Sequence, residues 1–390
     1  MKKIIAIILV VSGAIFYFFS PYYVLAKEDE DSEAQRILDE QKEKLEDFYK
    51  YINDKKTDVE LLNNLDAKEY VYNYIKSGEG NLSLKTVLDA VISLLFKEVK
   101  SVLTLTFSIL AIAIFSALIS NLQESFTSKG VSKVAFYACY ITLIMILSKS
   151  FLISIEVAKD VIYGVSDFMN SLLPFLLSMT SLSGGIVQAA TLDPIIMMLI
   201  IIIPKIYVNF IIPFILISFA LEFANNLSSG NKINNLCKII KQIIVWVQGI
   251  IMTGFVAVLT VKGITGKTID AVTLKTTKFA VDNFIPVVGK SFSDAITSVA
   301  SYALIIKNAL TTLGLVVVIL MIAYPIIKIT LMTFIYKLTA ALVEPISDKR
   351  IVLTIESVAK SMVLILSCVF CISLLFFILM GMMALAGKQV

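Results

Sequence analysis

The longest uncharged stretch of the chain runs from Ser361 to Gly387. This is enough for a transmembrane helix, which needs about 20 mostly apolar residues. The rest of the chain follows the same trend. Of its 390 residues 58% are hydrophobic and only 16% are charged, and the mean hydropathy is +0.87. Soluble domains carry roughly a quarter charged residues. The sequence therefore predicts an all-α, polytopic α-helical membrane protein.

The residue types present exclude several kinds of site. The chain has no His, so it cannot use His in acid–base catalysis or as a metal ligand. Its arginines are Arg36 and Arg350 alone, too few for extensive bidentate recognition of phosphates and bases. Cys368 and Cys371 have CxxC spacing but lie within the uncharged stretch, where we expect them to be small packed side chains. We therefore expect no enzymatic activity, no cofactor, no metal and no nucleic-acid partner.

Residues 1–26 have the layout of a cleavable signal sequence. Two lysines precede an apolar core from Ile4 to Phe19, and Val24-Leu25-Ala26 offers small residues for cleavage. The apolar core is long, so an uncleaved signal anchor is the alternative. In both cases the chain from Lys27 onward is placed outside the cytoplasm.

Residues 27–80 are rich in charge and predict a small extracytoplasmic helical domain. Between Lys27 and Glu60 there are thirteen Asp or Glu against seven Lys or Arg. Apolar residues such as Phe48 and Ile52 recur at near-heptad spacing, which is typical of a helix. Gly78 then breaks the helical pattern. The charged surface is either a solvated face or a surface that binds a partner.

The membrane domain covers residues 101–387, and we expect about six spans in it. The third of these spans, residues 194–221, is expected to begin at Asp193-Pro194, where Asp193 is a typical N-cap and Pro194 a first-turn proline. Pro204 and Pro213 within it predict a kinked or broken helix. The expected spans are residues 101–123, 134–155, 194–221, 242–261, 308–327 and 361–387.

Three other segments are expected to be amphipathic or re-entrant. Residues 81–100 place apolar side chains at i, i+3, i+4 and i+7, as in an amphipathic helix. Residues 168–192 lack charge but contain Pro, Gly and Ser, and predict a re-entrant or interfacial segment. Residues 262–307 form an insert with six Lys and three Asp. The insert is assigned to the outside, although the positive-inside rule that the other loops follow would place it inside.

The stretch Thr273–Ala295 of this insert predicts a helix–turn–helix. Pro286 pushes the residue before it out of the helical conformation, and Gly289 permits a turn. Gly289-Lys290-Ser291 resembles the end of a phosphate-binding loop, but Phe284 occupies the place of that motif's first glycine. An architectural or pathway-lining role is therefore expected. The candidate residues are Lys275, Lys278, Asp282, Asn283, Pro286, Gly289, Lys290 and Asp294.

Several polar motifs agree in order and spacing with one protein family. They are TLKTTKFAVDNFIPVVGKSFSDA with Leu304-Ile305-Ile306-Lys307-Asn308-Ala309 after it, Leu221-Glu222-Phe223, Trp246-Val247-Gln248-Gly249, Ala323-Tyr324-Pro325 and Ile335-Tyr336-Lys337-Leu338. From about Val87 to Gly387 the chain resembles the stage III sporulation protein AE family of endospore-forming bacteria.

The resemblance implies a location and a role. Members of the family lie in the mother-cell membrane that surrounds the forespore. With other proteins of the stage III sporulation operon and a forespore-side partner, they are thought to form a channel or secretion-like complex. That complex supports forespore development and late forespore gene expression. The resemblance thus implies a multi-pass cell-membrane protein that acts with partners, and it is compatible with an oligomer.

A stand-alone secondary transporter is the alternative function. Lys205, Lys328 and the prolines at 204, 213 and 325 would then mark broken helices around a midplane site. The chain shows no internal inverted repeat, which disfavours a transporter. A transporter should work when it is made alone, whereas a subunit of a conduit should require its partners.

Substitutions in the helix–turn–helix test its architectural role. We expect Pro286→Ala or Gly289→Val to impair assembly of the complex while the protein still reaches the membrane. The yield of heat-resistant spores and the amount of protein in isolated membranes measure the two effects separately. Normal sporulation in both variants would contradict the expectation.

Overall fold

The computed structural model of the protein describes residues 45–56, 65–78, 84–123, 129–227, 233–284 and 289–386. These residues form helices and short turns, with no strand among them. The chain divides into two compact units, Met1–Glu46 and Asp47–Val390, and the features described below all belong to the second. The predicted signal sequence, residues 1–26, lies outside the described part of the chain.

Two short helices precede the long ones. The described part of one covers residues 45–55, of which 47–55 belong to the second unit, and α3 (Ala67–Ser77) is the other. The Asp66 carboxylate caps α3 by accepting hydrogen bonds from the N–H groups of Lys68 and Glu69, each at 3.0 Å. Gly78, at φ 78°, closes the other end in the left-handed conformation. The helix thus ends at the glycine that the sequence indicated.

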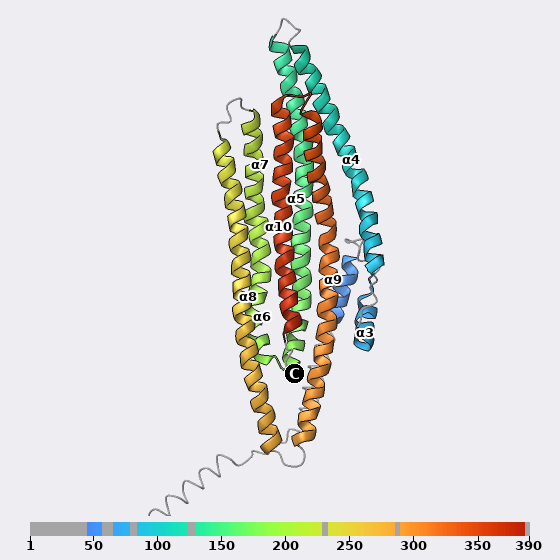
Figure 1. The fold of residues 1–390 in the computed structure, drawn as a ribbon, viewed down its shortest axis with the longest axis vertical. Coiled ribbons are helices and arrows are strands. Elements are labelled where there is room, and N and C mark those ends of the chain that lie inside the picture. Colours follow the sequence, from blue (N-terminus) through green and yellow to red (C-terminus); the bar gives the residue numbers. More distant parts are fainter. Residues whose placement is uncertain are drawn as a thin grey trace, which may run out of the picture. The chain divides into compact units, whose positions relative to one another are not determined.

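The remaining helices form long rods, with α6, η2 and α7 making one of them, and successive rods run in opposite directions (Figure 1). A π-helical turn, η2, joins α6 to α7 without a break in the chain of helical residues. The elements are α4 (Leu84–Gln123), α5 (Lys129–Leu182), α6 (Ile186–Ile206), η2 (Tyr207–Ile211), α7 (Ile212–Leu227), α8 (Asn234–Phe284), α9 (Gly289–Val343) and α10 (Lys349–Leu385).

Among the described residues, five helices are long and apolar enough to cross a membrane. They confirm the expected class, an all-α polytopic membrane protein, while the limits of each span remain predictions. At about 1.5 Å per residue, the 54 residues of α5 extend roughly 80 Å, against about 30 Å for the hydrocarbon core of a bilayer. The candidate spans are Val134–Leu182, Ile186–Leu227, Asn234–Gly263, Thr297–Val343 and Lys349–Leu385, and α4 adds the shorter apolar helix Thr106–Phe115.

The helix α10 forms the centre of the packing, because it contacts α5, α7, α8 and α9. Its side chains Ile355, Met362 and Leu379 are fully buried. Gly314 of α9 lies where α5 and α10 come closest, and a Cβ atom there would overlap the side chains of Leu172 and Met380. The absence of a side chain at this position therefore allows three helices to pack together.

The helical hydrogen bond that is lost at Pro204, in the third expected span, is replaced by one from a neighbouring helix. Pro204 has no N–H, so the carbonyl oxygen of Ile200, four residues earlier, cannot receive its usual helical hydrogen bond. The hydroxyl of Ser166, on α5, donates to this oxygen at 2.9 Å instead. The π-helical turn η2 follows directly and absorbs the local change in winding. The helical rod from α6 to α7 is therefore continuous, with a local change in winding at η2.

The start of α6 differs from the expectation. The helix begins at Ile186, so Asp193 does not cap it and Pro194 lies inside it. The cap comes from α8, where the buried carboxylate of Asp270 accepts hydrogen bonds from the N–H groups of Val187 at 2.7 Å and Gln188 at 2.9 Å. A distant residue supplies the cap, and local sequence therefore could not place this boundary.

The amphipathic and re-entrant segments are also parts of long helices. Residues 81–100 were expected to form a separate helix, but Leu84 onward is continuous with the apolar part of α4. Residues 168–182 complete α5, where Phe168 and Leu172 are fully buried, and a turn with Gly184 at φ 94° leads into α6. Residues 262–284 form the end of α8 and residues 289–307 the start of α9, whereas residues 285–288 lie outside the described part of the chain, so the helix–turn–helix remains a prediction.

Enlarging Gly314 should destabilise the bundle. We expect Gly314→Leu to lower the free energy of unfolding by about 1–3 kcal/mol through overpacking. Gly254→Leu on α8 is the matched control, because a Cβ atom there has nothing within 4 Å. Both changes raise helix propensity equally. Thermal unfolding of the purified proteins in detergent measures the difference, and equal unfolding temperatures for the two variants would contradict this account of the core.

Candidate functional site

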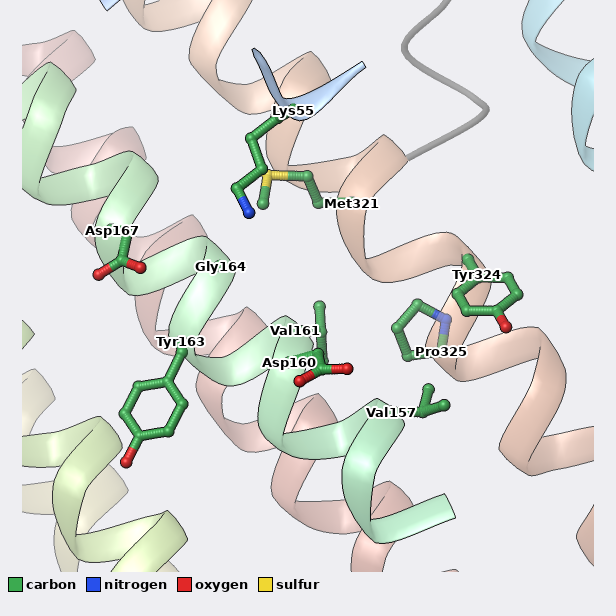
Figure 2. Close-up of a pocket in the computed structure, with 10 residues that line it drawn as sticks. All are labelled: Lys55, Val157, Asp160, Val161, Tyr163, Gly164, Asp167, Met321, Tyr324 and Pro325. Atoms are coloured by element: carbon green, nitrogen blue, oxygen red, sulfur yellow. The ribbon is translucent and has the colours of Figure 1, made fainter. Parts of the chain in front are cut away.

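A polar pocket lies between α5 and α9, below the short helix formed by residues 47–55 (Figure 2). Its volume is about 570 Å³, which is within the usual size range of ligand pockets. The helix α5 supplies most of the lining, and α9 supplies one side. The described lining residues are Lys55, Val157, Asp160, Val161, Tyr163, Gly164, Asp167, Met321, Tyr324 and Pro325.

Helical spacing places the acidic side chains of α5 together. Asp160 and Asp167 are seven residues apart, which is about two turns, with Gly164 between them on the same face. Both carboxylates are exposed in this chain. Charged side chains within membrane-length helices are costly in lipid and usually face a polar pathway or a cavity. Their position in this pocket agrees with that rule.

Gly164 and Pro325 shape the pocket wall. A Cβ atom at Gly164 would lie 3.2 Å from the terminal methyl carbon of Met321, so the glycine allows α9 to come close to α5. Pro325 lacks an N–H, so the carbonyl oxygen of Met321 loses its usual donor four residues on. The lining carries two carboxylates, and it therefore favours cations and hydrogen-bond donors as ligands.

A buried ion pair borders the pocket and joins α4 to α9. The amino group of Lys328 lies 3.7 Å from Oε2 of Glu98 and 2.6 Å from the Tyr324 hydroxyl oxygen. It also lies 5.0 Å from the centroid of the Tyr324 ring. Glu98 is only 7% exposed, and its Oε2 makes no hydrogen bond. The sequence placed Glu98 on the polar face of an amphipathic helix, whereas the structure buries it against a cation.

Other polar contacts lock neighbouring helices together. Glu222 of α7 forms an ion pair with Lys241 of α8 and accepts a hydrogen bond from Ser361 of α10 at 3.4 Å. Tyr336 of α9 hydrogen-bonds to Ser150 of α5, and both side chains are buried. These contacts involve residues of the family motifs, which therefore mark places where helices meet.

A third family motif contributes Gln248 of α8 to a contact with α10. Its side-chain amide donates to Sγ of Cys368 at 3.2 Å and accepts from the hydroxyl of Ser367 at 3.0 Å. Cys368 and Cys371 are free thiols within α10. Within the described part of the chain, no three His, Cys, Asp or Glu side chains gather as a metal site would require.

The residues singled out from the sequence lie elsewhere. Pro286 lies outside the described residues, and none of the other seven belongs to the described lining of the pocket. Their role remains a prediction. Lys275, Lys278, Asp282 and Asn283 lie in the last turns of α8, whereas Gly289, Lys290 and Asp294 lie in the first turns of α9.

Sequence reasoning missed most of the pocket. The seven-residue spacing of Asp160 and Asp167 was the available signal, because it puts both on one face of a helix. Tyr324 and Pro325 were named in a family motif, and Pro325 also under the transporter alternative. Nothing local could show that Lys55 would lie at the same place.

The fold and the pocket define the class: an all-α, multi-pass membrane protein with charged groups between two of its long helices. A family model described as stage III sporulation protein AE (spore_III_AE) matches residues 65–387. Stage III sporulation protein AE of Bacillus subtilis (strain 168) is 32% identical over 312 residues, covering 80% of this chain and 78% of that relative. No solved structure matches. The chain belongs to the stage III sporulation protein AE family, and its role is in sporulation.

Removing one member of the buried ion pair should destabilise the protein. Lys328→Met leaves Glu98 buried without a cation, which should cost about 3–5 kcal/mol of unfolding free energy. The double variant Glu98→Gln/Lys328→Met should recover most of this loss. Thermal unfolding in detergent measures both.

The matched control is the exposed pair of Glu356 and Lys360, which are 2.8 Å apart on α10. Breaking this pair by Lys360→Met should change stability by only about 0.5 kcal/mol or less. If Lys328→Met were no more harmful than Lys360→Met, the buried pair would not hold α4 against α9.

Proposed function

We propose that this protein is a non-enzymatic subunit of a channel or secretion-like complex that connects mother cell and forespore. It lies in the mother-cell membrane around the forespore. There it acts with other stage III sporulation proteins and a forespore-side partner, and it supports forespore development and late forespore gene expression. Membership of the stage III sporulation protein AE family supports this proposal of partners and location.

The observation that carries this proposal is the polar pocket. Asp160 and Asp167 project from α5, a helix long and apolar enough to cross a membrane, into a cavity shared with α9. Charges at such positions are retained where they serve a polar pathway. The exposed carboxylates would line the part of the conduit that this subunit contributes. No chemical step is required of them, because a conduit only has to offer a hydrated surface.

One observation favours a stand-alone transporter as second candidate. The rod from α6 to α7 contains Pro204 and the π-helical turn η2, and α9 contains Pro325 beside the pocket. Interrupted helices are common at transporter binding sites. Pull-down from sporulating cells separates the two functions. A conduit subunit should be recovered with other stage III proteins and be inactive without them, whereas a transporter should be active in vesicles alone.

Neutralising the pocket tests the pathway itself. We expect Asp160→Asn/Asp167→Asn to reduce the yield of heat-resistant spores, because the pathway loses its charge while the residues keep their size. Glu356→Gln, on the exposed pair of α10, is the matched control and should sporulate normally. Immunoblots of membranes establish equal amounts of protein. Full sporulation with both aspartates replaced would overturn the assignment of the pocket to the pathway.

A further inference from the structure

The short helix of residues 47–55, here named the cover helix, packs against α5 next to the pocket. Phe48 and Ile52 are both fully buried. The rings of Phe48 and Tyr51 lie 5.7 Å and 6.1 Å from the ring of Phe168. The hydroxyl of Tyr51 donates a hydrogen bond of 3.0 Å to the carbonyl oxygen of Gly164, which lines the pocket. The cover helix is therefore seated by one aromatic cluster and one directional bond.

Lys55 at the end of the cover helix reaches into the pocket. Figure 2 shows its side chain extending toward the part of α5 that carries Asp160 and Asp167. Among the described lining residues, Lys55 carries the positive charge, and Asp160 and Asp167 carry the negative charges. Opposite charges attract each other more strongly where water is partly excluded. The pocket thus receives an ammonium group from the chain's own cover.

The cover helix depends on its contacts. In proteins, helices are stabilised mainly by the packing of their apolar face against other elements, and Phe48 and Ile52 provide that face here. Its far side meets α3, where the amino group of Lys68 lies 5.6 Å from the centroid of the Tyr49 ring. Burial, with a smaller contribution from the charge of Asp66, raises the pKa of Tyr49 to about 12. Loss of its contacts would therefore release the helix as a unit.

We propose that the cover helix is a removable plug and that Lys55 occupies an ammonium-binding position between Asp160 and Asp167. The seated plug fills this position and narrows access to the pocket, and access widens when the plug leaves. The inference rests on the proposed function in one respect, which is that the plug serves to control access to the pathway. The docking itself is a property of this chain and is tested without partners.

The test measures how fast a thiol in the pocket reacts. The four native cysteines are replaced by alanine, and Val157→Cys places one thiol in the lining. The full-length protein is purified in detergent and treated with an uncharged methanethiosulfonate reagent, so that the rate reports access and not attraction of the reagent to the aspartates. We expect Lys55→Glu to speed labelling about tenfold or more, because repulsion from the aspartates unseats the plug. Lys55→Arg should label as slowly as the parent.

Two controls make the result specific. Lys50→Glu introduces the same charge change at an exposed position of the cover helix and should leave the labelling rate unchanged. A second reporter, Met145→Cys, lies on an exposed part of α5 and should react at one rate in every variant. A change at this reporter would reveal a general loss of structure. Lys55→Glu would then be replaced by Tyr51→Phe, which removes only the bond to Gly164 and should also speed labelling.

A charge reversal completes the test. Lys55→Glu combined with Asp160→Lys/Asp167→Lys restores attraction and should return labelling to the parent rate when an uncharged thiol reagent is used. The proposal is overturned if Lys55→Glu labels no faster than Lys50→Glu, or if the reversal fails to restore protection. Because no partner or spore is involved, this outcome is separate from any failure of the proposed conduit function.

Discussion

The burial of α10 is the interaction on which the rest of the structure depends. This helix contacts α5, α7, α8 and α9, so its position sets theirs. Apolar side chains alone fix the register of membrane helices weakly, since lipid is as apolar as they are. Hydrogen bonds supply the direction. Tyr140 of α5 bonds to Thr354 at 2.8 Å, and Gln248 of α8 bonds to Ser367 and Cys368.

The pocket lies between α5 and α9, beside two residues that alter the packing of these helices. Gly164 adds no side chain, and Pro325 removes a helical hydrogen bond. Aspartates on the same face of α5 then give the cavity its charge. The same chain closes other helix interruptions with polar groups, as Ser166 does for Pro204. The pocket therefore stands out as a place where polar groups face a space instead of a partner helix.

The family assignment and the pocket address different levels of function. Family membership gives a role in sporulation, but it does not identify the part of the chain that carries the role. The pocket is the part that we propose for this role, and the cover helix is the proposed means of controlling access to it. The predicted helix–turn–helix of residues 273–295 remains a candidate surface for partners.

The sequence by itself determined the class of the protein. Long uncharged runs must form helices in a membrane, because every backbone polar group needs an internal partner there. It also placed the helix end at Gly78, where local chemistry decides. Only the tertiary structure decided the start of α6, which Asp270 caps from another helix, and the meeting of Lys55 with Asp160. These features join residues far apart in the chain, and local periodicity carries no information about which helices become neighbours.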